Sequence, residues 1–287
     1  MNKRPKILVV GSLMMNHGIE TSVIPEEGQT VMGEDIQKSP GGKGANQAVQ
    51  MARLGADVTL IGKIGRDQDG KELIKVCKEA GVHTEQILYD DTLPTGSSIV
   101  LLEKIPGRKV KKRSIIVPGA CMAITVDEIC YLEDEIEKYD LVVLRADRPD
   151  MDIKECFTRL SSYLSENGKL IFACENALGL NFLSGAVHDE EETAFTKGEL
   201  EEAFKEAGLS KVEFYYPMPE YKRAVSVYSD RYLPGKGDIP HVTAVYDRQR
   251  WACIHEDEIS DKLVQEKAFG LFSNAYLAVA SKGAESF

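Results

Sequence analysis

The stretch Gly41-Gly42-Lys43-Gly44-Ala45-Asn46-Gln47-Ala48 places three glycines ahead of a segment whose apolar residues have helical spacing. Glycine has no side chain, so the backbone can approach a ligand closely, and a helix starting here presents its first N–H groups. The Asn46 amide can both donate to and accept from hydroxyl groups. The stretch predicts either a ligand-binding turn or a glycine-rich helix start without a ligand. Its spacing is neither that of a dinucleotide-binding motif nor that of a Walker motif.

Strands and helices alternate on both sides of this stretch. Short apolar runs between amphipathic segments are typical of buried parallel strands. Strands are expected at 6–10, 58–61, 95–103, 113–117, 140–144 and 169–174, and helices at 44–54, 69–80, 152–164 and 196–208. A Pro-Gly pair and a basic turn join 95–103 to 113–117, which indicates a hairpin. Strands at 212–216, 224–228, 242–246 and 276–280 follow with few helices between them. The pattern predicts a three-layer, Rossmann-like α/β fold with a mainly parallel sheet, a small β hairpin and antiparallel strands toward the C-terminus.

Composition narrows the classes of function. The chain has 287 residues, 43% of them hydrophobic, and a formal net charge of −11, which argues against nucleic acid as a partner. The basic run at 104–113 is typical of a solvated turn. No apolar run is long enough to span a bilayer, and the N-terminus is not typical of a signal peptide, so a cytoplasmic protein is expected. The six cysteines lack metal-ligand spacing, which predicts reduced thiols and no metal site.

Several motifs occur in an order and spacing that resemble the ribokinase-like carbohydrate kinases. They are Val-Val-Gly-Ser at 9–12, Gly-Gly-Lys-Gly-Ala-Asn at 41–46, Gly-Arg-Asp-Gln-Asp-Gly at 65–70, Pro-Thr-Gly at 94–96 and Pro-Gly-Ala-Cys at 118–121. The resemblance covers residues 6–144. It implies a sugar-binding half at 1–146 in which Gly42, Lys43 and Asn46 contact the sugar, with Gly41 and Gly44 in the same turn. It also implies that the hairpin at 95–117 is a lid, which would exclude water from the site and could form a homodimer contact. The sequence itself leaves the oligomeric state open.

This half departs from the family pattern at the expected sugar site. The family places Asn and Asp after Gly-Ser, where this chain has Met14 and Asn16. Asn16 can still bond a hydroxyl group, but it cannot form a charge-assisted bond, and Met14 offers no useful hydrogen bond. A later sugar-contacting Glu of the family falls near Asp147, which is also consistent with a surface residue.

The segment that the family uses for phosphoryl transfer is absent from this sequence. The resemblance implies ATP-dependent phosphorylation of a sugar such as ribose, with ATP and Mg²⁺ as cofactors. It assigns the helix N-terminus and catalytic base to an Asp-Thr-x-Gly-Ala-Gly-Asp segment. The nearest string, at 233–238, ends in Asp238 and is followed by Pro240, which favours a turn into a strand over a helix. No catalytic residue is therefore assigned, and impaired catalysis is expected.

Residues 147–287 resemble the C-terminal part of class I methyltransferases that use S-adenosylmethionine. The resemblance is carried by the segments 157–164, 167–180, 195–200, 214–219 and 272–277. Glu175-Asn176 follows a strand and is consistent with either a substrate mouth or a strand-end cap. The family's glycine-rich loop for the methyl donor does not occur in this chain, so S-adenosylmethionine ranks below ATP as the expected cofactor.

Three hypotheses follow for the function. The first is a ribokinase-like carbohydrate kinase with an incomplete phosphoryl-transfer apparatus, whose partner is a small sugar. The second is a methyltransferase-like protein of unknown acceptor. The third is a non-catalytic chimera of the two folds, with the junction between 120 and 150. A more acidic second half, with 16 basic and 25 acidic residues in 147–287, supports a boundary near the middle.

Overall fold

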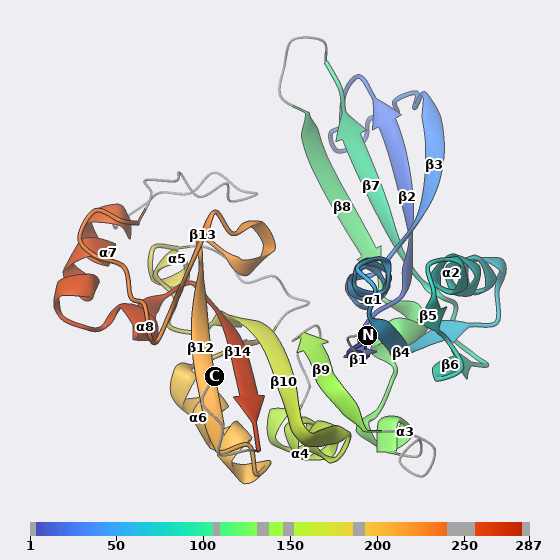
Figure 1. Cartoon of the computed structure of the whole chain (residues 1–287). Helices are drawn as coiled ribbons and strands as arrows, with labels where there is room; N and C mark the ends of the chain where they lie inside the picture. Colours follow the sequence, from blue (N-terminus) through green and yellow to red (C-terminus); the bar gives the residue numbers. More distant parts are fainter. Residues whose placement is uncertain are drawn as a thin grey trace. The chain divides into compact units, whose positions relative to one another are not determined.

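The computed structural model describes residues 4–105, 110–130, 138–145, 152–185, 193–239 and 256–282. The chain forms two compact units, Met1–Glu135 and Ile136–Phe287 (Figure 1). Each unit combines strands with helices, and the predicted α/β class is confirmed. None of the described helices is long and apolar enough to cross a membrane.

The first unit is built around a parallel sheet. Its strands are β1 (Lys6–Val10), β4 (Asp57–Gly65), β5 (Val82–His83) and β6 (Ile87–Asp90). β4 lies at the centre, and β1, β5 and β6 all pair with it in parallel. Leu8, Val9, Leu60 and Ile61 are fully buried, as the short apolar runs predicted. The carboxyl ends of β1 and β4 therefore lie at the same edge of the sheet.

Helices of this unit begin and end where the sequence indicated. They are α1 (Lys43–Arg53), α2 (Gln68–Glu79) and α3 (Val126–Cys130), with a 3₁₀ turn at Gly119–Met122. Gly55 follows α1 with a φ of 96°, a conformation that an L-residue adopts only with strain. Asp67 caps α2 by accepting the Gly70 N–H at 2.8 Å.

The predicted hairpin at 95–117 is confirmed as part of a larger sheet. Four strands, β2 (Met14–Thr21), β3 (Asp35–Gly41), β7 (Gly96–Glu103) and β8 (Lys111–Val117), lie in the order β3-β2-β7-β8. β7 and β8 are antiparallel, β2 runs parallel to β7, and β3 is antiparallel to β2. We call these four strands the lid sheet; they extend away from the parallel strands of the same unit (Figure 1).

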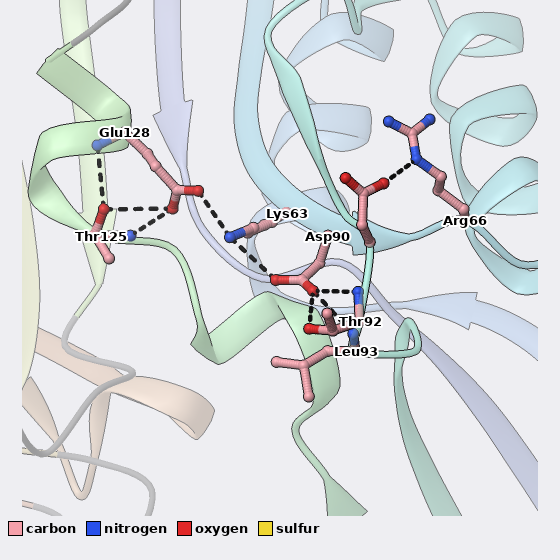
Figure 2. Close-up of polar contacts among 8 residues, drawn as sticks. Lys63, Arg66, Asp90, Thr92, Leu93, Thr125 and Glu128 are labelled. Carbon is pink, nitrogen blue, oxygen red and sulfur yellow. Dashed lines mark hydrogen bonds and ion pairs between the residues drawn. The ribbon is translucent and has the colours of Figure 1, made fainter.

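A buried lysine ties the carboxyl ends of β4 and β6 to α3 (Figure 2). The Lys63 ammonium lies 2.7 Å from Glu128 Oε1 and 3.1 Å from Asp90 Oδ2, and its side chain is only 10% exposed. The bond to Glu128, followed by the contact with Asp90, raises the pKa of Lys63 against the effect of burial. Backbone N–H groups of Leu93 and Thr92 hold the pKa of Asp90 well below its usual range. All three groups are therefore charged at neutral pH.

The second unit has parallel strands and an antiparallel end, as predicted. Its strands are β9 (Tyr139–Arg145), β10 (Leu164–Asn176), β11 (Ala194–Phe195), β12 (Lys211–Met218), β13 (Ser226–Ser229) and β14 (Ala275–Ser281). β9 and β11 pair with β10 in parallel. β14 is antiparallel to both β10 and β12, and β13 is antiparallel to β12. The strand expected at 242–246 lies outside the described residues.

Aromatic packing forms the core of this unit. Its helices are α4 (Ile153–Ser162), α5 (Leu180–Leu183), α6 (Lys197–Glu206), α7 (Glu256–Gln265) and α8 (Phe269–Phe272). The ring of Phe157 on α4 stacks on Phe204 of α6 at 4.3 Å and meets Phe172 of β10 edge-on at 4.9 Å. Thr196 and Glu199 form the predicted capping box of α6. Both helices are thereby held against β10.

Phe157→Ala should lower the free energy of unfolding by about 4 kcal/mol, because the substitution leaves a cavity beside two rings. Leu183 is 49% exposed. Leu183→Ala should therefore change the free energy of unfolding by less than about 0.5 kcal/mol. Urea unfolding followed by circular dichroism measures both. Equal shifts for the two variants would show that the aromatic cluster is not the core of this unit.

Lys63→Met should destabilise the protein by about 3 kcal/mol, since it leaves two carboxylates facing each other without their shared cation. Lys75→Met is the matched control, because Lys75 is 73% exposed and contacts Glu79 only at 3.9 Å. The control should shift stability by less than about 0.5 kcal/mol. Thermal unfolding compares the variants, and an unchanged midpoint in Lys63→Met would rule out the cluster as a stabilising element.

The same cluster predicts a loss of stability in acid. The pKa values of Asp90 and Glu128 are lowered in the folded protein. The two carboxylates stabilise the folded protein at pH values above their unfolded-state pKa values, which are about 4. This stabilisation is lost as the pH falls toward their folded-state pKa values. The unfolding midpoint should therefore drop between about pH 5 and pH 3, and less steeply in Lys63→Met. Thermal melts at a series of pH values test this, and parallel slopes would contradict it.

Candidate functional site

The glycines of the 41–48 stretch let the start of α1 pack directly on the turn between β1 and β2. A Cβ at Gly44 would lie 2.5 Å from the Gly11 carbonyl carbon, and a Cβ at Gly42 would lie 2.4 Å from Ser12 O. Gly42 also has a φ of 92°. For these glycines two alternatives were expected, a close approach to a ligand and a glycine-rich helix start without a ligand. The structure shows a close approach to the chain's own backbone, which fixes the helix start at the carboxyl edge of β1.

Ser12 satisfies most of the N–H groups at the start of α1. Its hydroxyl accepts the Lys43 N–H at 3.1 Å, and its carbonyl accepts the Ala45 N–H at 3.1 Å. The Gly44 N–H has no acceptor among the residues that the structure describes. The helix N-terminus carries partial positive charge, so this N–H can bond an oxygen of a ligand.

The root of the lid sheet carries a polar group beside this turn. Asn16 of β2 pairs in register with Ser39 of β3 and Ser98 of β7. The Ser98 hydroxyl donates to Asn16 Oδ1 at 2.7 Å. The Asn16 amide nitrogen faces Gly41, where an added Cβ would lie only 2.2 Å from it. Absence of a side chain at Gly41 thus makes room for the Asn16 amide.

Two motifs of the sequence analysis bind each other at the root of β7. Asp67 accepts the Thr95 N–H and the Thr95 hydroxyl, each at 2.7 Å, while it also caps α2. Burial alone would raise the pKa of Asp67, but these bonds and the one from Gly70 outweigh it and lower the pKa. The carboxylate therefore stays charged and fixes Thr95, which positions Ser98 three residues later.

The α2 helix also contacts the other face of the lid sheet. Asp69 Oδ1 accepts a bond from Lys38 of β3 at 3.0 Å, and Asp69 Oδ2 lies 3.6 Å from His17 Nε2. Asn16 and His17 are neighbours on β2, so their side chains point to opposite faces. The face that carries Asn16 is consequently the one that faces away from Asp69.

The structure brings together most of the predicted site residues. Asn16 lies against Gly41, and Gly42, Lys43 and Gly44 follow at the start of α1, with Lys43 half-buried. Asn46 is exposed on the first turn of α1. Asp147 lies outside the described residues.

Sequence reasoning missed Ser12 and Ser98 as part of this arrangement. In the sequence, Ser12 belongs to the Gly-Ser pair after β1, and Ser98 lies just beyond Pro-Thr-Gly. A serine at the end of a buried strand is the one signal that could have identified Ser12.

The buried amide of Asn176 is satisfied by partners within the second unit. Asn176, fully buried at the end of β10, donates to the carbonyls of Leu271 and Ser273 and accepts the Leu178 N–H. Glu175-Asn176 was expected to form either a substrate mouth or a strand-end cap. The bonds of Asn176 are those of a strand-end cap.

Lys197, Tyr216 and Asp230 form a bonded cluster in this unit. Lys197 Nζ donates to Tyr216 Oη at 2.9 Å and to Asp230 Oδ1 at 2.8 Å, and the Tyr216 hydroxyl donates to Asp230. Burial raises the pKa of Tyr216, so the phenol stays neutral. These bonds join α6 to β12 and to the residue after β13.

The string that ends in Asp238 forms a turn. Asp238 Oδ2 accepts the Gly235 N–H at 2.8 Å, and the Gly235 carbonyl accepts the Asp238 N–H at 3.2 Å. No helix begins in the described residues 230–239. The expectation of a turn at this string agrees with the structure.

Acidic, histidine and cysteine side chains do not gather into a metal site in the described part of the chain. No group of three or more of them has the geometry to hold an ion there.

Comparisons with known proteins agree on the first unit and extend beyond it. Residues 4–207 match the model of the pfkB family carbohydrate kinases. The chain is 34% identical to the ribokinase of Bacillus subtilis (strain 168) over 149 residues, which cover 52% of this chain and 49% of the relative. It is 35% identical to the ribokinase of Lactococcus lactis subsp. lactis (strain IL1403) over 145 residues, which cover 50% and 46%. The chain thus spans about half the length of the curated relatives it matches.

One solved structure resembles nearly the whole chain in fold. The crystal structure of Sa239 has a TM-score of 0.57 and 18% sequence identity, and the match covers 93% of this chain and 91% of that one. This likeness concerns the fold alone. The family model covers more than two thirds of the chain and continues past residue 147. The chain therefore belongs to the pfkB family of carbohydrate kinases.

Proposed function

We propose that the first unit binds a sugar of the ribose class at the start of α1 and the root of the lid sheet. The proposed contacts are Asn16, Gly41, Gly42, Lys43, Gly44 and Asn46, with Asp147 as a further contact. The observation that carries the proposal is the position of the Asn16 amide against Gly41, the residue directly before the N-cap of α1. A donor from a lid strand and a donor from a helix N-terminus then act on the same ligand. Family membership supports the choice of a sugar.

The proposed reaction is ATP-dependent phosphorylation of a sugar hydroxyl, with impaired catalysis. A carbohydrate kinase requires a phosphoryl donor, and ATP with Mg²⁺ is the donor that the family resemblance implies. The residues of this chain do not fit that donor. The Asp-Thr-x-Gly-Ala-Gly-Asp segment is absent from the sequence, and Asp238 is engaged in a turn. No residue is assigned to ATP, to Mg²⁺ or to a catalytic base.

The alternative proposal concerns the second unit as a methyltransferase-like domain that uses S-adenosylmethionine. Its support is the set of sequence segments quoted above and the antiparallel strand β14 between β10 and β12. The missing glycine-rich loop weighs against it, and a non-catalytic chimera of the two folds would explain both missing cofactor segments. Binding of S-adenosylmethionine in the micromolar range would favour the methyltransferase proposal.

We also propose a cytoplasmic location and a homodimer through the lid sheet. Cys77, Cys121, Cys156 and Cys174 are buried and not joined in disulfides, which is consistent with a reducing compartment. Ile115, Ile116 and Val117 are 60%, 37% and 44% exposed on the edge strand β8. Apolar side chains on an open strand edge are typical of a surface that another chain covers.

Asn46→Ala should weaken ribose binding by at least about tenfold, because it removes one hydrogen-bond pair worth about 1.5 kcal/mol. Asn46 is exposed, so the variant should keep the wild-type unfolding midpoint. Gln50→Ala is the control, since Gln50 is also exposed on α1 but lies one turn further from the glycines. Isothermal titration with ribose measures the affinities.

A coupled assay with ribose, ATP and Mg²⁺ tests the impaired catalysis. Turnover at the 1–100 s⁻¹ typical of kinases would refute impairment. Equal ribose affinity in Asn46→Ala and wild type would remove Asn46 from the site, and no ribose binding by the wild type would refute the sugar site.

A further inference from the structure

The orientation of the Asn16 amide decides what this position of the site can bind. This inference rests on the proposed sugar site. Ser98 is buried, at 8% exposure, and its hydroxyl donates to Asn16 Oδ1 at 2.7 Å. A hydroxyl bond of this length directs Oδ1 toward β7 and Nδ2 toward Gly41. Asn16 therefore presents its two N–H donors, and not its oxygen, beside the start of α1.

These donors have no acceptor within the described part of the protein. Ser98 is the hydrogen-bond partner of Asn16 there, and the partly exposed Nδ2 has none. An amide N–H gains most from an acceptor oxygen, and a charged acceptor makes the bond about twice as strong as a neutral one. A sugar hydroxyl can also accept a hydrogen bond from the amide, but its own O–H then needs another acceptor.

The segments around Asn16 contain no carboxylate side chain that could accept the proton of a sugar hydroxyl. The segments 12–16, 39–46 and 96–98 meet at the root of the lid sheet and contain no Asp or Glu. Lys43 is their one charged residue, and the Gly44 N–H adds another donor. The space at Gly41 is filled by the Asn16 amide itself, and Met14, two residues before Asn16, lies on the same face beside Gly96. This part of the site is therefore rich in donors and lacks acidic side chains.

We propose that the site prefers a sugar acid over the neutral sugar. The ligand class is a five-carbon polyhydroxy carboxylate, an aldonate, whose carboxylate oxygen accepts from Asn16 Nδ2. Replacement of a neutral acceptor by a charged one is worth about 1.4 kcal/mol, or tenfold in affinity.

Isothermal titration of the full chain with D-ribose and with D-ribonate, at constant ionic strength, tests the proposal. D-ribonate should bind at least about tenfold more tightly than D-ribose. Asn16→Asp should reverse the order, because a carboxylate repels D-ribonate and accepts from the hydroxyls of D-ribose. Thermal unfolding confirms that the variant is folded.

Ser98→Ala provides a second test that leaves Asn16 in place. Without the Ser98 hydroxyl the amide can rotate and present Oδ1, so the preference for D-ribonate should fall at least about threefold. Ser97→Ala is the control, since Ser97 is the neighbour on β7 that points to the other face. It should keep the wild-type preference.

The outcomes separate this inference from the proposed function. D-ribose binding as tightly as D-ribonate would overturn the preference and leave the sugar site intact. Binding of neither ligand would overturn the sugar site itself. An unchanged preference in Asn16→Asp would show that another residue selects the carboxylate.

Discussion

The first unit depends on one close approach between two backbone segments. Gly11 and Gly44 face each other so closely that a Cβ on either would overlap the other's backbone. The start of α1 can therefore lie on the β1–β2 turn, where Ser12 accepts two of its N–H groups. Any larger side chain at these glycines would separate the helix from the strand end. The position of Asn16, four residues after Ser12, is set by the same contact.

Charged groups with full sets of partners hold the surrounding strand ends. Lys63 joins β4 and β6 to α3, and Asp67 joins α2 to the first residue before β7. A buried charge is costly unless bonds replace the water it loses, and both residues have such bonds. The result is that the ends of β4, β6 and β7 are tied to α3 and α2 within the first unit. In the second unit, aromatic rings perform the corresponding task for α4 and α6.

Local sequence patterns predicted the elements with strong periodicity and clear caps. The strand at Lys6–Val10 and the helices α1, α2, α4 and α6 were predicted within a few residues of their bounds. β2 and β3 were missed, because β3 is exposed along most of its length and shows no alternation of apolar and polar residues. Its pairing with β2 is a tertiary contact that propensity does not encode. β10 is longer than predicted because its first residues pair with β9 across an irregular register.

The sequence predicted where the candidate site lies. It did not predict which hydrogen bonds form there. The glycine cluster marks the helix start, but a sequence cannot distinguish an approach to a ligand from an approach to the chain itself. Ser98 gives no signal on its own, since its importance comes from a partner 82 residues away. The absence of acidic residues around Asn16 was readable, yet its meaning required the strand register that places 12–16, 39–46 and 96–98 together.

A short connection joins β1 to β2, so the root of the lid sheet lies next to the start of α1. Only Gly11, Ser12 and Leu13 separate the two strands, and β7 begins directly after the residue that Asp67 fixes. β2 is eight residues long, about 26 Å at the rise of a strand, so a rotation of about 10° at its root would displace its far end by about 4 Å. A rotation of this kind at the Ser12 end of β2 would therefore be larger at the far end of the strand than at its root. A second copy of the chain bound at the far end of β2 would then be displaced by a rotation at the glycine turn.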